Sequence, residues 1–218
     1  MIRENVERIL RQIPSYVEVV AATKKRTPSE ILEAITAGIK IIGENYIQEA
    51  EKKIEVIGNK NVDWHFIGHL QKNKVKKAVR LFDMIQTLDS IELAQLLDKE
   101  CKKIGKIMPV LIEINIAKES TKTGIFPDDL DSLVKEILPL ENLKVMGLMT
   151  MGPLVEHSYQ LRPYFREIKR LFDDIKEEYP ALSDFKYLSM GMSSSFKVAI
   201  EEGANMIRLG TVIFDPRE

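Results

Sequence analysis

The chain has 218 residues, of which 44% are hydrophobic and 30% charged, and its formal net charge is -1. This balance is typical of a soluble globular protein and gives no reason to expect binding to nucleic acid or to an anionic membrane. The single cysteine, Cys101, excludes an internal disulfide framework, and no apolar run approaches the roughly 20 residues of a membrane span, so we expect a cytoplasmic protein.

Short apolar runs alternate with helical patterns along the chain, after an amphipathic helix that carries Val6, Leu10 and Ile13. The predicted strands are Val17–Lys24, Ile39–Gly43, Trp64–Ile67, Met84–Thr87, Pro109–Ile116, Leu143–Leu148, Tyr187–Ser189 and Met206–Leu209. The predicted helices between them are Pro28–Ala37, Tyr46–Ile57, Gln71–Leu81, Ile91–Ile104, Pro127–Leu138, His157–Tyr179 and Ser194–Glu202. We expect no helix after the last strand.

This alternation predicts the fold class. Repeated strand–helix units place parallel strands side by side, with helices on the outside of the sheet. Eight such units predict an α/β protein made of a single (β/α)8 TIM barrel with an additional N-terminal helix. Because no linker, low-complexity stretch or long charge run interrupts the pattern, we expect one domain over residues 1–218.

The first predicted strand ends in Lys24. In a barrel one set of alternating residues faces the interior, and here this set is Val20, Ala22 and Lys24. Lys24 would then lie at the C-terminal rim, where barrel active sites are found, and a partly desolvated lysine there can act as an amine nucleophile. The alternative is a solvated basic turn formed with Lys25 and Arg26, which the spacing does not exclude.

Other strand ends carry polar side chains that have two interpretations each. Asn45 follows the second strand, where it either caps the next helix or faces a ligand from the rim. His65 and His69 are four residues apart, but Gly68 and the strand pattern argue against two metal ligands on one face of a helix. The sequence also suggests no third metal ligand. We therefore expect no metal site, and the roles of the two histidines stay open.

The last two predicted strands end in turns that suit a phosphate group. Gly191 and Ser193 precede a short helix, and Gly210 and Thr211 follow the last strand. Backbone N–H groups at such turns bind anions, and many α/β barrels hold a phosphate with the loops of their last two strands. Arg208 lies inside the last strand, where an unpaired charge is costly to bury, so we expect it to have a definite partner.

Seven stretches of the chain together match one known family. They are Ala22–Lys24, Gly43–Glu49, Trp64–Lys74, Lys122–Gly124, Gly147–Met151, Leu188–Ser193 and Arg208–Thr211. With them the chain resembles the pyridoxal phosphate homeostasis family over nearly its whole length. The members of this family are small single-barrel proteins similar to the N-terminal domain of bacterial alanine racemases.

The resemblance implies a binding site for pyridoxal 5'-phosphate. It implies that Lys24 forms a Schiff base with this cofactor and that Asn45 lies beside its ring. Arg208 would face the pyridine nitrogen and keep it unprotonated, which weakens the ring as an electron sink. The phosphate would be held by Ser193, Gly210 and Thr211.

The chain departs from the usual family pattern at two places. Ser194 and Ser195 stand where acidic residues are common, and the segment Val212–Glu218 stands where Phe-Gly is usual. Neither departure falls on a residue with an implied cofactor role, so they concern the local shape of the loops.

The resemblance further implies a role in vitamin B6 homeostasis, in which the protein stores pyridoxal phosphate or delivers it to apoenzymes without robust catalytic turnover. One alternative is a racemase-like enzyme, but alanine racemases take a second base from a C-terminal β domain, and the barrel uses all 218 residues here. Another is a cofactor-free Schiff-base lyase or aldolase that acts on a phosphorylated substrate. We expect a monomer, since no part of the implied site requires another chain.

Overall fold

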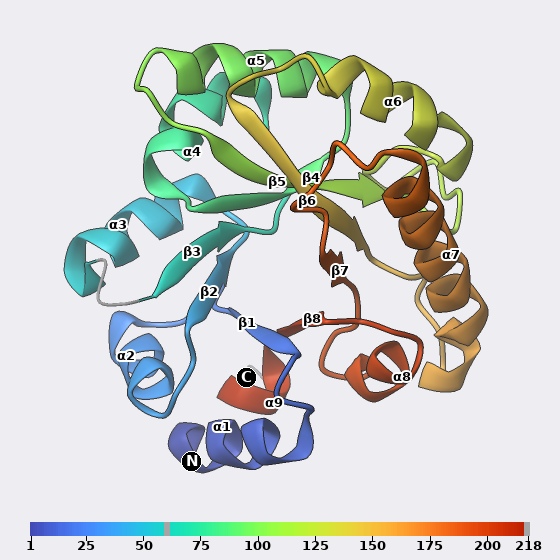
Figure 1. Cartoon of the computed structure of the whole chain (residues 1–218). Helices are drawn as coiled ribbons and strands as arrows, with labels where there is room; N and C mark the ends of the chain where they lie inside the picture. Colours follow the sequence, from blue (N-terminus) through green and yellow to red (C-terminus); the bar gives the residue numbers. More distant parts are fainter. Residues whose placement is uncertain (59–61, 216–218) are drawn as a thin grey trace.

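Eight parallel strands form a closed barrel at the centre of the molecule, in the order of the chain (Figure 1). The barrel closes because β1 pairs with both β2 and β8. The computed structural model describes residues 1–58 and 62–215. The strands are β1 (Glu18–Ala22), β2 (Ile41–Glu44), β3 (Asp63–Phe66), β4 (Met84–Leu88), β5 (Met108–Ile114), β6 (Leu143–Thr150), β7 (Tyr187–Ser189) and β8 (Met206–Leu209).

Helices surround the barrel as an outer layer (Figure 1). They are α1 (Ile2–Gln12), α2 (Pro28–Thr36), α3 (Ile47–Ile57), α4 (Val75–Leu81), α5 (Ile91–Lys102), α6 (Leu130–Ile137), α7 (Arg162–Glu178), α8 (Phe196–Glu201) and α9 (Thr211–Phe214). Short 3-10 turns precede three of them, namely η1 (Lys72–Lys74), η2 (Pro127–Asp129) and η3 (Ser158–Leu161). The predicted TIM barrel with an additional N-terminal helix is confirmed. No helix in the described ranges is long and apolar enough to cross a membrane.

The predicted strands are all present, and no strand end differs from its predicted position by more than two residues. A larger difference concerns the helix predicted from His157 onward, because α7 begins only at Arg162. Pro163 lies in its first turn and has no N–H to donate to a preceding carbonyl, so α-helical hydrogen bonding begins beside it. The 3-10 turn η3 occupies the segment just before this point.

The expectation that no helix follows the last strand was wrong. The four residues Thr211–Phe214 form α9, which is one helical turn and too short to show a hydrophobic period in the sequence. The N-terminal helix α1 packs against α2 and α9 and covers this side of the barrel (Figure 1). Part of the departing segment Val212–Glu218 therefore lies in α9, whereas residues 216–218 lie outside the described residues.

The barrel wall separates two apolar clusters. Val20 belongs to the inner cluster and Ala22 packs against it, while Val19 and Ala21 belong to the outer cluster between strands and helices. The alternation predicted for the first strand is confirmed. Four of the buried residues inside the barrel are methionines, which fill an irregular interior well; the inner cluster consists of Val20, Ile41, Ile67, Met84, Leu111, Met146, Met149 and Met206.

The connection from β1 to α2 is short and well capped. Thr27 and Glu30 form a capping box, in which each side chain satisfies the backbone N–H of the other, and Pro28 occupies the first helical position. These are sequence signals that start a helix at a defined residue. Lys24 therefore lies in a turn that is fixed by a strand on one side and by a capped helix on the other.

Candidate functional site

A cavity of about 470 Å³ opens at the C-terminal ends of the strands. Its volume lies in the range of small-molecule binding sites. Residues from the first three strand ends and from the last three strand ends share its wall, which is lined by Ala22, Lys24, Asn45, Ile67, Met151, Met192, Ser193, Ser194, Arg208, Gly210 and Thr211. All six residues to which the resemblance assigns a cofactor role thus line one cavity, although Asn45 and Ser193 lie 148 positions apart in the sequence.

Lys24 is half-buried and lines the cavity from the end of β1. Its neighbour Lys25 is exposed and has a φ of 61°, so the chain turns sharply after Lys24. The two lysines therefore differ in surroundings, and only Lys24 is among the residues that line this cavity. This placement agrees with the prediction that Lys24, rather than Lys25, faces the barrel mouth.

A buried ionic cluster holds the backbone on both sides of Lys24. Lys53 is buried, and its ammonium group donates to the carbonyl of Thr23 at 2.7 Å, to Glu44 at 2.6 Å and to Glu49 at 3.2 Å. Glu49 in turn accepts the backbone N–H of Lys25 at 2.9 Å. Burial raises the pKa of Glu44, against the lowering effect of hydrogen bonds from Lys53 and Thr23. Since each end of the turn has a fixed partner, the position of Lys24 is determined by residues that do not line the cavity themselves.

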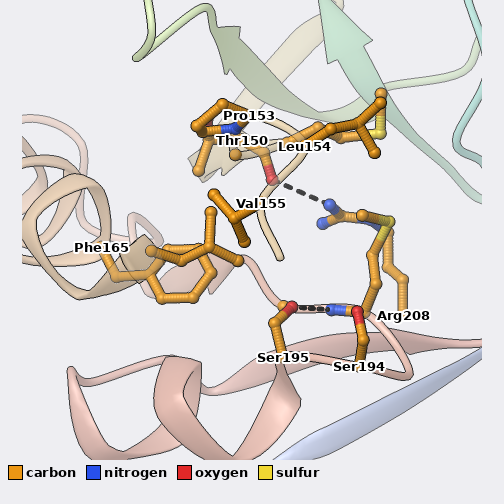
Figure 2. A pocket seen from close by; sticks show the side chains of 13 residues that line it. Thr150, Pro153, Leu154, Val155, Phe165, Ser194, Ser195 and Arg208 are labelled. Atoms are coloured by element: carbon orange, nitrogen blue, oxygen red, sulfur yellow. Dashed lines mark hydrogen bonds between the residues drawn. The ribbon is translucent and has the colours of Figure 1, made fainter. Parts of the chain in front are cut away.

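Arg208 reaches from β8 across the barrel mouth. Figure 2 shows its guanidinium pointing toward Thr150, at the end of β6. Nη2 donates to the carbonyl of Thr150 at 2.8 Å and Nη1 donates to the hydroxyl of Ser189 at 2.7 Å. The partner predicted for Arg208 thus consists of a carbonyl and a hydroxyl rather than an acid. The same side chain separates the large cavity from a small one of about 70 Å³.

The charge of Arg208 persists in spite of its burial. Burial lowers the pKa of Arg208 to about 10, and the negative charge of Glu113 opposes this shift. A pKa near 10 leaves the guanidinium charged at neutral pH. The mouth of the barrel therefore presents a fixed cation that can donate hydrogen bonds and accept none.

The loops after β7 and β8 meet at one oxygen atom. The hydroxyl oxygen of Ser193 accepts the backbone N–H of Gly210 at 3.1 Å and that of Val212 at 3.4 Å. Two backbone donors from one loop thus converge on the wall of the cavity, next to a hydroxyl from the other. Because both N–H groups bind this oxygen, the Ser193 hydroxyl retains its own hydrogen to donate to an anionic group such as phosphate.

The loop that carries Ser193 has a defined shape. Gly191 has a φ of 92°, and a Cβ there would lie 2.6 Å from the Cβ of Ala199, so only glycine fits. Ser195 is buried and accepts the backbone N–H of Met192 at 3.1 Å, whereas Ser194 is exposed and lines the cavity. Ser194 and Ser195 both differ from the usual family pattern. Ser195 therefore shapes the loop, and Ser194 lies in the cavity wall.

Asn45 does not cap the helix that follows it. The N-cap of α3 is Tyr46, which has no side-chain cap hydrogen bond, and Asn45 lines the cavity. The loop after β3 approaches it closely, because a Cβ on Gly68 would lie 2.3 Å from the backbone oxygen of Asn45. Of the two interpretations of Asn45, the structure favours the one in which it faces a ligand.

The two histidines have different surroundings. His65 is buried, and burial lowers its pKa to about 3, so the imidazole is neutral at physiological pH. His69 is 56% exposed, with its Nδ1 3.5 Å from a carboxylate oxygen of Asp89. Within residues 1–58 and 62–215, no group of three or more His, Cys, Asp or Glu side chains is arranged to hold a metal ion.

Sequence reasoning missed the residues that support the site. Lys53 and Glu44 hold the Lys24 turn, while Gln86 and Ser189 lie inside the barrel behind Arg208. Glu113 is also buried, burial raises its pKa, and its Oε2 has no hydrogen-bond partner. The available signal was a polar residue at an interior position of an otherwise apolar strand, as in Gln86 of β4 and Glu113 of β5.

Together these groups define what the cavity can bind. A primary amine, a fixed guanidinium and a pair of backbone donors line one cavity of small-molecule size. The arrangement suits a small planar molecule that carries an anionic group at one end and a carbonyl that an amine can attack.

The family description "Alanine racemase, N-terminal domain" matches residues 1–217 of the chain. The pyridoxal phosphate homeostasis protein of Aquifex aeolicus (strain VF5) is 40% identical over 225 residues, which cover 99% of this chain and 98% of that protein. The protein of the same name from Escherichia coli (strain K12) is 36% identical over 210 residues, which cover 94% and 88% of the two chains.

Solved structures agree with these relatives. PipY of Synechococcus elongatus PCC7942, in a structure with PLP bound, superimposes with a TM-score of 0.91 at 32% identity, over 98% of this chain and 100% of that one. An alanine racemase of Clostridium difficile 630 gives a TM-score of 0.78 at 14% identity, over 97% of this chain and 56% of that one, a likeness that concerns the fold alone.

Proposed function

We propose, since the chain belongs to the family of the pyridoxal phosphate homeostasis proteins, that it binds pyridoxal 5'-phosphate at the barrel mouth and holds it for storage or delivery. The observation that carries this proposal is the convergence of the six implied cofactor residues on one cavity. They are Lys24, Asn45, Ser193, Arg208, Gly210 and Thr211.

The residues present fit this cofactor. When bound, pyridoxal phosphate supplies an aldehyde that condenses reversibly with a primary amine as a Schiff base, with the release of one water. Lys24 supplies the amine and is half-buried in the wall of the cavity. Asn45 would lie beside the ring, and Ser193, Gly210 and Thr211 would hold the phosphate.

Arg208 provides the reason for a carrier rather than an enzyme. A charged guanidinium would donate to the ring nitrogen and keep it unprotonated, which would weaken the electron withdrawal that amino-acid chemistry needs. We therefore propose reversible binding without robust turnover, in the cytoplasm, by a monomer that passes the cofactor to apoenzymes.

The binding test uses the purified protein incubated with pyridoxal phosphate. We expect a visible absorption band, and after borohydride reduction a pyridoxyl adduct on the peptide that contains Lys24. Lys24→Ala should lose the band, whereas Lys25→Ala, a matched control on the adjacent exposed residue, should keep it. If the unchanged protein shows no band after incubation with pyridoxal phosphate, the proposal of cofactor binding is wrong. A cofactor-free lyase is then the favoured function.

A second experiment separates the carrier from a racemase-like enzyme. The loaded protein is incubated with each common amino acid, and loss of optical rotation and release of keto acid are followed. We expect no turnover above that of free pyridoxal phosphate. A substantial turnover number with any amino acid would contradict the carrier proposal.

A further inference from the structure

A chain of buried hydrogen bonds crosses the interior of the barrel behind Arg208. Gln86 of β4 lies between two partners, with its Nε2 2.9 Å from Nδ1 of His65 and its Oε1 2.7 Å from the hydroxyl of Ser189. The Ser189 oxygen is in turn 2.7 Å from Nη1 of Arg208. All four side chains are buried, so no bulk water competes for these bonds.

Met206 defines which groups donate and which accept along this chain of hydrogen bonds. Its sulfur lies 3.3 Å from the Nε2 of Gln86, and because a thioether can only accept, the amide end there must be the NH2 group. One amide hydrogen is directed to Met206 and the other to Nδ1 of His65, which accepts because burial keeps the imidazole neutral. The Oε1 of Gln86 is left as an acceptor for Ser189.

The direction of these hydrogen bonds determines what Ser189 can offer to Arg208. Ser189 uses its only hydrogen to donate to Gln86, so its oxygen offers only lone pairs to the guanidinium. The second nitrogen, Nη2, is held by the carbonyl of Thr150. With one acceptor on each of these two nitrogens, the plane of the guanidinium is fixed while Arg208 lines the cavity.

We propose that Gln86 and Ser189 are positioning residues that act through Arg208, and that this buried chain fixes the orientation in which the guanidinium meets the cofactor ring. The ring contact itself rests on the proposed function. The positioning of Arg208 does not, because the hydrogen bonds lie within the protein alone.

The first test therefore uses the protein without cofactor. In a ¹H–¹⁵N spectrum of the guanidinium groups, blocked rotation should give Arg208 separate Nη1 and Nη2 signals, assigned by their loss in Arg208→Lys. In Gln86→Met and in Ser189→Ala these two signals should merge. Met84→Leu is the control, since it changes a buried side chain on the same strand without removing any of these hydrogen bonds. Unchanged Arg208 signals in both variants would overturn the proposal.

The second test measures pyridoxal phosphate affinity by absorption titration. We expect binding about tenfold weaker in Gln86→Met and in Ser189→Ala, the loss typical of one hydrogen bond to a charged group, and no change in Met84→Leu. In the Arg208→Lys background the Gln86→Met change should have no further effect. An equal additional loss there would mean that Gln86 acts on the fold and not through Arg208.

Thermal unfolding of each variant accompanies both tests, so that loss of structure is recognised. If the unchanged protein does not bind pyridoxal phosphate, the proposed function fails, and the guanidinium spectrum alone decides whether Gln86 and Ser189 position Arg208.

Discussion

At the scale of single residues, the charged groups of the cavity are positioned by buried polar neighbours. Lys53 and Glu49 hold the turn of Lys24, and Ser189 holds Arg208. Polar groups are costly to bury without hydrogen-bond partners, and each of these buried groups has such a partner. The orientation of Lys24 and Arg208 therefore depends on residues that do not line the cavity.

His65 makes the stability of the fold depend on pH. Its pKa is about 3 in the folded protein and near 6.5 in the unfolded chain, so between these values the unfolded state binds a proton that the folded state does not. The stability that this pKa difference contributes is fully present above pH 6.5 and is lost as the pH falls toward 3.

When the pH falls from 8 to 5, protonation of His65 in the unfolded state should lower the free energy of unfolding by about 2 kcal/mol. Each pH unit below 6.5 accounts for about 1.4 kcal/mol of this loss. Urea unfolding at both pH values measures the loss, which should be smaller by this amount in His65→Gln. His69→Gln, at an exposed position, should retain the full loss. Equal pH dependence in His65→Gln and the unchanged protein would contradict the assignment.

Ser193 should distinguish phosphorylated from unphosphorylated ligands. Its hydroxyl lies where the backbone donors of Gly210 and Val212 converge, so Ser193→Ala removes one contact to the phosphate. We expect about tenfold weaker binding of pyridoxal phosphate and unchanged binding of pyridoxal, measured by absorption titration. A similar loss for both ligands would mean that Ser193 does not contact the phosphate.

At the scale of elements, the ends of β6, β7 and β8 form one side of the cavity, and the ends of β1, β2 and β3 form the other. Strand alternation predicts which side chains face inward, and helix caps such as Thr27 predict where the turns end. The extents of α7 and α9 were harder to predict, because a proline in the first turn and a single helical turn leave little periodic signal.

Gly191 is expected to be essential for the shape of the β7 loop. Its φ of 92° is unfavourable for alanine, and a Cβ would lie 2.6 Å from that of Ala199 in α8. Gly203 is the matched control, since its φ is 99° but its nearest contact is the flexible end of Lys169. Both alanine variants should lose about 1–3 kcal/mol through backbone strain.

Only Gly191→Ala should also weaken pyridoxal phosphate binding, by at least about tenfold, since it must displace the loop that carries Ser193. Urea unfolding and absorption titration of the two variants measure these effects. Equal binding by both variants would show that the loop tolerates the extra atom.

At the scale of the whole molecule, closure of the barrel by pairing of β1 with β8 brings the first and the last strand together at the cavity. The inside of the barrel is apolar around Val20, Met84 and Met206, and polar nearer the mouth. A ligand held by strands from both ends should therefore stabilise the entire fold rather than one loop.

This stabilisation is measurable by thermal unfolding. Pyridoxal phosphate at about 100 times its Kd should add about 2.7 kcal/mol, which raises the Tm of a chain of this length by roughly 5 to 10 °C. Lys24→Ala should have the Tm of the unchanged protein without ligand and a much smaller increase with it. A full increase in Lys24→Ala would mean that the amine does not hold the cofactor.

The amino-acid sequence is sufficient to predict the fold class, the inward side of β1, and six of the eleven residues that line the cavity. These follow from local rules, namely the period of apolar residues, the turn chemistry of glycine and serine, and recognisable motifs. Only the tertiary structure decided the partners of Arg208, the buried cluster around Lys53, and the chain through Gln86. Such partners come from strands that are distant in the sequence, and their contacts exist only once the barrel has closed.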